Sequence, residues 1–289
     1  TMATGPLWNA EFRRIDVTPV AGALGAEIAG VDLNALDDEQ VAEVRAALLK
    51  YAVVFFRDQD LTPDGQTAFA RRFGPLNRHP YVTPMDGHPD VFRITKEPED
   101  KHHFGNSWHT DLAYTETPAL GTVLYGVEVP AAGGDTLFAS QTAAFEALSD
   151  GMKAMLGGMK VVYTNANSYG KGSARFRDGV AKAMDVRQAE GREVVHPVVR
   201  THPETGRKGL YLSATHFARF DAMTAEESRP LFDYLVDHAT RPQHLCRFRW
   251  QNGSVAMWDN RCTMHYAISD FPNDRRIMQR VTLEGDAPF

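Results

Sequence analysis

The last third of the chain consists of short β-branched and aromatic runs separated by turn signals, and this pattern constrains the fold most. VVRTHPETGRKGLYL (198–212) predicts two strands around a Pro-Glu-Thr-Gly turn. CRFRWQNGSVAMW (246–258) predicts a hairpin at Asn252-Gly253, a dipeptide typical of two-residue hairpin turns. RRIMQRVTLEG (275–285) predicts a final strand. A β-rich fold follows from these segments.

The first two thirds alternate helical and extended patterns. Apolar residues recur at helical spacing in four segments, 39–51, 62–73, 143–156 and 225–240. Short apolar runs predict buried strands at 52–56, 91–94 and 121–129. Because no internal repeat or low-complexity linker interrupts the chain, we expect one domain, residues 2–289, with helices outside a β core.

Composition narrows the class of protein. The 31 Lys and Arg against 37 Asp and Glu give a net charge of −6, which argues against nucleic-acid binding but allows a local basic pocket for a small anion. Two cysteines form no disulfide framework, and no apolar run reaches the roughly 18 residues of a membrane span. The start of the chain lacks a secretory apolar region, so a cytoplasmic protein without membrane association is expected.

Two residues with metal-binding side chains stand close together in a loop-rich region. His109 and Asp111 are separated by one residue, so on an extended backbone both side chains reach the same face. Two histidines and one carboxylate form the open facial site of non-haem Fe(II) oxygenases, which requires a second, distant histidine. His265 is the best candidate, and Arg276 follows it at the start of the last predicted strand, where it could grip a carboxylate. The competing interpretation is a surface turn in which Asp111 accepts a backbone hydrogen bond.

Three segments of the chain resemble the taurine dioxygenase (TauD/TfdA) family of Fe(II)- and 2-oxoglutarate-dependent dioxygenases. They are HTD (109–111), GGDT (133–136) and WDNRCTMHYAISDFPNDRRIMQRVTLEGDAPF (258–289). The resemblance implies an α+β fold with a double-stranded β-helix (jelly roll) core and flanking helices. It further implies that Fe(II), 2-oxoglutarate and O2 together hydroxylate a small anionic substrate, releasing succinate and CO2 with C–S or C–O cleavage. Homo-oligomers, dimers or tetramers, are common in the family.

The same resemblance assigns roles to individual residues. His109, Asp111 and His265 match the iron ligands, and no catalytic side chain is implied beyond this metal centre. Thr136 and Arg276 match the residues that hold the distal carboxylate of 2-oxoglutarate. The expected substrate contacts are His79, Arg280, Tyr81 and Asn106. Cys262, near His265 in sequence, is a candidate for oxidation.

The substrate has two interpretations within the family. A taurine-like sulfonate, and hence taurine catabolism, is favoured by the match of His79 and Arg280. The taurine enzymes, however, carry an asparagine four residues before the first histidine ligand, where this chain has Gly105. FGNSWHTD (104–111), AMDV (183–186) and HPVVRTHPETGRKGLY (196–211) resemble the aryloxyalkanoate branch, so an aryloxyalkanoate or alkyl sulfate dioxygenase is the alternative. A non-oxidative cupin-like metal or ligand-binding protein is the alternative from another class, although it would not need Thr136 and Arg276.

Overall fold

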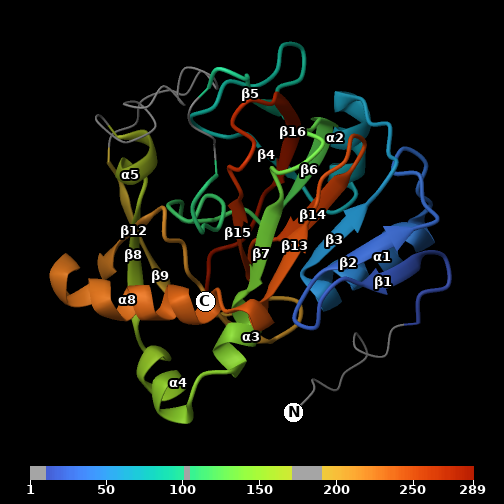
Figure 1. Cartoon of the computed structure of the whole chain (residues 1–289). Helices are drawn as coiled ribbons and strands as arrows, with labels where there is room; N and C mark the ends of the chain where they lie inside the picture. The colour runs from blue at the N-terminus through green and yellow to red at the C-terminus, as the bar shows by residue number, and fades with distance from the viewer. Residues whose placement is uncertain (1–10, 101–104, 171–190) are drawn as a thin grey trace.

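The computed structural model describes residues 11–100, 105–170 and 191–289, and its core is formed by two facing β-sheets (Figure 1). Phe104, the first residue of FGNSWHTD, and the segment AMDV (183–186) lie outside the described residues. The main sheet has the order β1-β2-β3-β14-β6-β16-β4, and β5 also pairs with β16. Its strands are β1 (Asp16–Pro19), β2 (Ala26–Ala29), β3 (Val53–Phe56), β4 (Leu76–Asn77), β5 (Phe92–Lys96), β6 (Gly121–Glu128), β14 (Val255–Asp259) and β16 (Arg276–Leu283).

The second sheet has the order β13-β7-β15 and is antiparallel throughout. Its strands are β7 (Thr136–Ser140), β13 (Leu245–Phe248) and β15 (Thr263–Ala267). Aromatic pairs join the two sheets: Phe55 stacks on Phe248 with ring centroids 4.1 Å apart, and Phe138 lies 5.5 Å from Trp258. This arrangement of facing sheets with flanking helices confirms the predicted α+β class with a jelly-roll type core.

Two smaller sheets complete the fold, and the three-stranded one lies on the side of the second sheet (Figure 1). One has the order β12-β8-β9 and the other is the pair β10-β11. Their strands are β8 (Lys160–Thr164), β9 (Glu193–Pro197), β10 (Val199–Thr201), β11 (Lys208–Leu210) and β12 (Phe217–Phe220). The predicted pair of strands around the Pro-Glu-Thr-Gly turn is therefore present as β10 and β11.

The helices cover the outside of the sheets, and side-chain caps fix where the longer ones begin. In α1 (Asp38–Tyr51), Asp37 and Gln40 form a capping box, and in α8 (Ala225–Ala239) Thr224 and Glu227 do the same. The remaining helices are α2 (Pro63–Arg71), α3 (Gln141–Glu146), α4 (Asp150–Leu156), α5 (Ala166–Tyr169) and the 3-10 turn η1 (Pro242–His244). None of the described helices is long and apolar enough to cross a membrane.

Two local predictions were wrong. The segment 143–156 forms two helices, α3 and α4, because the Ser149 side chain accepts the Met152 N–H and starts a new helix. The strands flanking Asn252-Gly253 do not pair with each other, since β13 pairs with β7 whereas β14 pairs with β3 and β6. The turn itself forms, with Gly253 at a φ of 81°, but it carries the chain from one sheet to the other.

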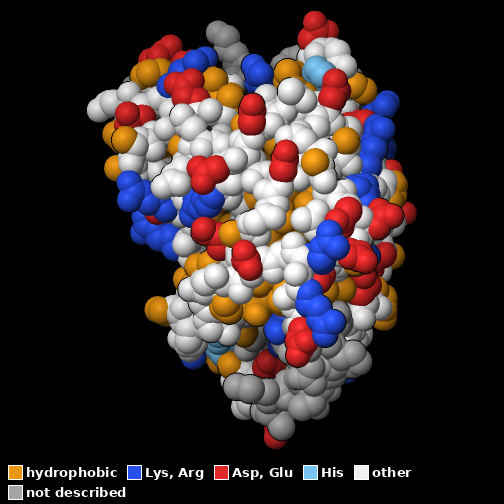
Figure 2. Space-filling model, turned by 90° about the vertical axis from the view of Figure 1, so that its right-hand side faces the viewer, with side chains coloured by type: hydrophobic (Ala, Val, Ile, Leu, Met, Phe, Trp, Pro, Cys, Tyr) orange, Lys and Arg blue, Asp and Glu red, His pale blue; other side chains and the backbone are white. Residues whose placement is uncertain are grey.

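On the face drawn in Figure 2, acidic and basic side chains are interspersed, and neither sign forms a large continuous patch.

A buried histidine on β9 provides a stability prediction. The His196 Nε2 donates to the Thr115 carbonyl oxygen at 2.9 Å, and burial lowers the pKa of His196 although this hydrogen bond opposes the shift. The unfolded chain therefore takes up this proton near its ordinary pKa of about 6.5, before the folded protein does, so that stability falls as the pH drops below that value. His196→Gln keeps an N–H donor, and we expect its free energy of unfolding to vary less between about pH 7 and pH 5 than that of the parent. Urea unfolding at several pH values checks this. The same change of unfolding free energy with pH in His196→Gln and in the parent would contradict it.

Candidate metal and co-substrate site

Backbone pairing brings the three predicted metal ligands together. The His109 N–H donates to the His265 carbonyl oxygen at 3.1 Å, and the His265 N–H donates to the His109 carbonyl oxygen at 2.9 Å. The Nε2 atoms of His109 and His265 lie 3.8 and 3.6 Å from Oδ1 of Asp111. One potential ligand atom from each residue lies within 4.8 Å of the others, and all three residues are buried.

The protonation states suit metal binding. The Nδ1 of His109 donates to the Ser107 carbonyl oxygen at 2.7 Å, which leaves the Nε2 lone pair directed to the shared centre. Burial, together with the neighbouring His109, lowers the pKa of His265 well below its usual value, so its imidazole is neutral and can act as a ligand. Two imidazole nitrogens and one carboxylate oxygen are a donor set that fits Fe(II).

The second oxygen of Asp111 is held by two donors. Its Oδ2 accepts hydrogen bonds from the Thr122 hydroxyl at 3.0 Å and pairs with the Arg280 Nη2 at 2.7 Å. Burial disfavours the charged carboxylate, but the charge of Arg280 outweighs this effect and holds the pKa of Asp111 well below its usual value. Only Oδ1 therefore faces the two histidines, and Asp111 is arranged to offer one oxygen to an ion.

Asn260 supports this arrangement and was not found by sequence reasoning. Its Oδ1 accepts the Asp111 backbone N–H at 3.3 Å and the Trp258 Nε1–H at 3.0 Å. Its Nδ2 lies 3.5 Å from the Thr122 hydroxyl. The residue sits in the WDN segment that begins the C-terminal block, which was the available signal, whereas Thr122 carried none.

The predicted co-substrate residues, Thr136 and Arg276, both lie near the Trp250 ring. The Trp250 Nε1–H donates to the Thr136 hydroxyl at 3.0 Å, which leaves the Thr136 hydroxyl proton available to an anion. The Arg276 guanidinium lies 5.8 Å from the ring centroids of both Trp250 and Phe271. Burial lowers the pKa of Arg276 to about 10, with Asp135 opposing the shift. A buried guanidinium and a hydroxyl donor that share Trp250 as a neighbour fit a carboxylate such as that of 2-oxoglutarate.

His265 and Arg276 lie on strands of different sheets, since β15 belongs to the second sheet and β16 to the main sheet. The loop 268–275 crosses between the sheets, so the two residues approach the interior from opposite sides.

The predicted substrate residues have different surroundings. Arg280 is 5% exposed, pairs with Asp111, and lies 5.5 Å from the Phe92 ring centroid. His79 lies 5.8 Å from the same ring, and its Nδ1 accepts the Tyr81 backbone N–H. Asn106 is exposed and takes no part in these contacts within the described residues. The structure thus links Arg280 to His79 and Tyr81 through Phe92.

Aromatic rings continue from His79 as a cluster of Tyr81, Tyr114 and Tyr169. The ring centroids of Tyr81 and Tyr169 lie 4.8 Å apart, and those of Tyr114 and Tyr169 lie 5.6 Å apart. The Tyr169 hydroxyl is 3.2 Å from the His79 Nε2, and Asn165 donates to the Tyr81 hydroxyl at 2.9 Å. Tyr114 and Tyr169 were not predicted, because aromatic residues are by default assigned to the core. The cluster offers apolar ring faces with neutral polar tips.

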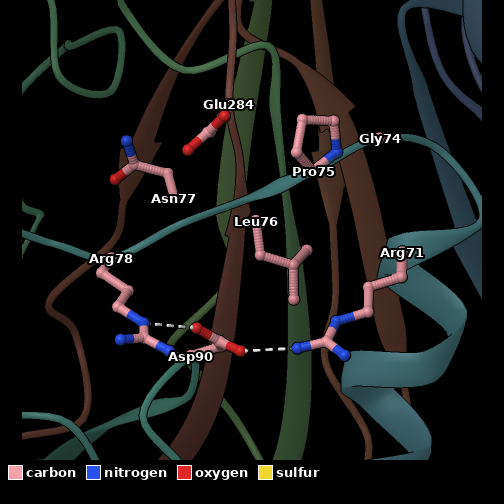
Figure 3. Close-up of a pocket in the computed structure, with 8 residues that line it drawn as sticks. All are labelled: Arg71, Gly74, Pro75, Leu76, Asn77, Arg78, Asp90 and Glu284. Atoms are coloured by element: carbon pink, nitrogen blue, oxygen red, sulfur yellow. Dashed lines mark hydrogen bonds and ion pairs between the residues drawn. The ribbon is translucent and has the colours of Figure 1, made fainter.

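Ion pairs in an outer groove hold the segment that precedes His79 (Figure 3). It is lined by Arg71, Gly74, Pro75, Leu76, Asn77, Arg78, Asp90 and Glu284. Arg78 and Arg71 pair with the two oxygens of Asp90 at 2.9 and 2.8 Å. The hydrogen bond from Arg78 is the main cause that lowers the pKa of Asp90. These pairs anchor the backbone immediately before His79 to the end of α2.

A second group with metal-ligating side chains consists of the buried His202 and Asp259 and the half-buried Cys262. Both oxygens of Asp259 are paired with Arg261, and the His202 Nδ1 accepts two backbone N–H groups. A guanidinium inside the group occupies the place of a cation, so we assign it a structural role. Burial raises the pKa of the Cys262 thiol, which disfavours the reactive thiolate form of this residue.

A jelly-roll type core with two histidines and one carboxylate directed to a common centre defines a class, the non-haem iron oxygenases. Residues 16–282 match the family described as "Taurine catabolism dioxygenase TauD, TfdA family". The chain belongs to this family and is an Fe(II)- and 2-oxoglutarate-dependent dioxygenase that uses O2.

Similar proteins carry different substrate names. The chain is 36% identical to an α-ketoglutarate-dependent sulfate ester dioxygenase from Pseudomonas putida, over 95% of this chain and 91% of the relative. It is 34% identical to an (S)-phenoxypropionate/α-ketoglutarate dioxygenase from Sphingobium herbicidovorans, over 94% of this chain and 95% of the relative. The crystal structure of a taurine dioxygenase from Burkholderia xenovorans superposes with a TM-score of 0.80 at 37% identity, covering 96% of this chain and 93% of that one.

Proposed function

We propose that residues 2–289 form one dioxygenase domain that oxidises an organic sulfate ester with an apolar chain. His109, Asp111 and His265 hold the iron, and Thr136 and Arg276 hold the distal carboxylate of 2-oxoglutarate. The ligands span positions 109 to 265 and meet in one cavity, which supports the single domain. When bound, the iron supplies a centre at which O2 and 2-oxoglutarate oxidise a substrate C–H bond, with release of succinate and CO2.

The proposed substrate class rests on the line of contacts that runs from Arg280 to the tyrosine cluster. Arg280 provides a cation for the anionic end, and Phe92 connects it to His79. Beyond His79, Tyr81, Tyr114 and Tyr169 provide ring faces for an alkyl or aryl group. Hydroxylation of the carbon next to the ester oxygen then gives an intermediate that breaks its C–O bond, releasing sulfate and an aldehyde.

The test is succinate release in air across a matched panel of anions. We expect hexyl sulfate to be turned over with a higher kcat/KM than ethyl sulfate, hexanesulfonate or taurine, with sulfate and succinate formed in equal amounts. Ethyl sulfate is the control for the apolar chain, and hexanesulfonate is the control for the leaving group. Taurine as the best substrate by a wide margin would contradict the proposal, and phenoxyacetate as the best substrate would assign the aryloxyalkanoate alternative.

Two substitutions separate the contacts of Arg280. Thr122→Val removes one donor to the Asp111 Oδ2, so we expect the iron affinity to fall about 10- to 100-fold while the KM for the primary substrate stays unchanged. Arg280→Gln removes the ion pair and the substrate cation together, so we expect both a lower iron affinity and a higher KM for the primary substrate. Iron titration and steady-state kinetics check this. An unchanged substrate KM in Arg280→Gln would contradict the role of Arg280 in substrate binding.

A further inference from the structure

Lys96, at the end of β5, is a buried lysine that binds backbone. Lys96 is only 5% exposed, and its Nζ donates to the carbonyl oxygens of Glu97, Pro272 and Asp274 at 3.1, 2.9 and 3.1 Å. An ammonium group has three donors, so these contacts use all of them. Pro272 and Asp274 belong to the loop 268–275 that crosses between the sheets and ends at Arg276. Lys96, on β5, therefore holds the loop that leads into the neighbouring strand β16.

The loop places one aromatic ring against the co-substrate pocket. The Phe271 ring centroid lies 5.3 Å from the Lys96 Nζ and 5.8 Å from the Arg276 guanidinium carbon. Lys96 and Arg276 are directly opposite each other in the β5–β16 ladder, so their side chains emerge on the same face. Like charges opposite each other on a sheet repel, and here both cations contact the same ring.

The same loop is seated on the segment that carries Thr136. The Gly134 N–H donates to the Asp270 Oδ1 at 2.7 Å. A Cβ at Gly134 would lie 3.2 Å from the Phe271 ring, so glycine permits the ring to pack directly on this backbone. Gly134 also has a φ of 70°, a conformation that other residues rarely adopt. Phe271 thus touches both sides of the pocket, the Thr136 side and the Arg276 side.

We propose that Lys96 is a positioning residue for 2-oxoglutarate. By fastening the loop, it sets Phe271 against Arg276, so that the guanidinium is held in one orientation in a pocket from which water is excluded. The distal carboxylate of the co-substrate then meets a preorganised cation. This inference rests on the proposed roles of Thr136 and Arg276 and adds a residue that does not itself touch the co-substrate.

The test compares Lys96→Met with a matched control, Lys160→Met, which changes an exposed lysine. In the Mn(II)-loaded enzyme, which measures binding without turnover, we expect Lys96→Met to weaken 2-oxoglutarate affinity about tenfold and Lys160→Met to leave it unchanged. In the Fe(II) enzyme the KM for this co-substrate is expected to rise by a similar factor. The KM for the primary substrate, and kcat at saturating 2-oxoglutarate, are expected to stay within about twofold. Lys96→Arg, which retains a cation with several donors, is expected to recover much of the affinity.

The double variant tests the route through Phe271. If Lys96 acts by placing this ring, Lys96→Met adds little to the loss already caused by Phe271→Ala. Additive losses would overturn that route, and an unchanged 2-oxoglutarate affinity in Lys96→Met would overturn the proposal. An equal loss in all kinetic constants together with a lower melting temperature would also overturn it, because that result indicates a general structural role. Should Lys96→Met fail to fold, Phe271→Leu carries the test: weakened 2-oxoglutarate binding supports the proposal, and unchanged binding overturns it.

Failure of this inference is distinguishable from failure of the proposed function. If Arg276→Met weakens 2-oxoglutarate binding but Lys96→Met does not, only the role of Lys96 is wrong. If neither variant weakens binding, the assignment of the co-substrate pocket is wrong.

Discussion

Asp111→Ala is expected to abolish iron binding and, in the metal-free protein, to lower the free energy of unfolding by about 3–5 kcal/mol. The first effect follows from loss of one of three ligands. The second follows because the side chains of Arg280 and Asp111 are only 6% and 5% exposed, so alanine leaves a buried guanidinium without its carboxylate. A ligand residue whose loss destabilises the protein even without metal is a specific consequence of this ion pair.

Urea unfolding in the presence of a chelator measures the second effect. The double variant Asp111→Ala/Arg280→Met removes both charges, and it is expected to recover much of the lost stability while binding no iron. His109→Ala is the matched control, because it removes a ligand without isolating a charge. A metal-free Asp111→Ala protein as stable as the parent would show that the ion pair does not form.

Arg276→Met is expected to raise the KM for the co-substrate 2-oxoglutarate by about 30-fold or more, since truncating one partner of a buried charge pair costs about 2–5 kcal/mol. Stability should respond in the opposite direction. Burial lowers the pKa of Arg276 to about 10, so the folded protein disfavours this charge relative to the unfolded chain. Replacing it with a neutral side chain removes that cost, and the protein without co-substrate is expected to be at least as stable as the parent.

Steady-state kinetics with varied 2-oxoglutarate and thermal unfolding without it check both halves of this prediction. Arg275→Met is the matched control, because Arg275 is a neighbouring exposed arginine that pairs with Glu97 and Glu128. A rise in KM of less than about threefold for Arg276→Met would contradict its role as the carboxylate partner.

Local sequence signals predicted those parts of the fold that depend on local contacts. The helix 39–51 was predicted from apolar spacing, and the structure confirms it as α1, with Asp37 in a capping box. The Asn252-Gly253 turn was also predicted, but not the sheets that its flanking strands join. Strand partners are chosen by contacts distant in sequence, and a turn signal contains no information about them.

The site shows the same division. The spacing of His109 and Asp111, with the C-terminal block around His265, located the three residues that the structure brings together. Thr122 and Asn260 were not predicted because they act on Asp111 through contacts between segments distant in sequence. Arg280 was assigned to the substrate, and its pairing with Asp111 was missed for the same reason.

In the proposed function, His109, Asp111 and His265 hold an iron that leaves room for 2-oxoglutarate beside Arg276. The most direct measurement is a visible absorption titration of the protein with Fe(II) and 2-oxoglutarate in the absence of O2. A weak charge-transfer band that saturates with one 2-oxoglutarate per iron, and disappears in His265→Ala, is the predicted result. Absence of the band in protein that releases succinate in air would contradict the account.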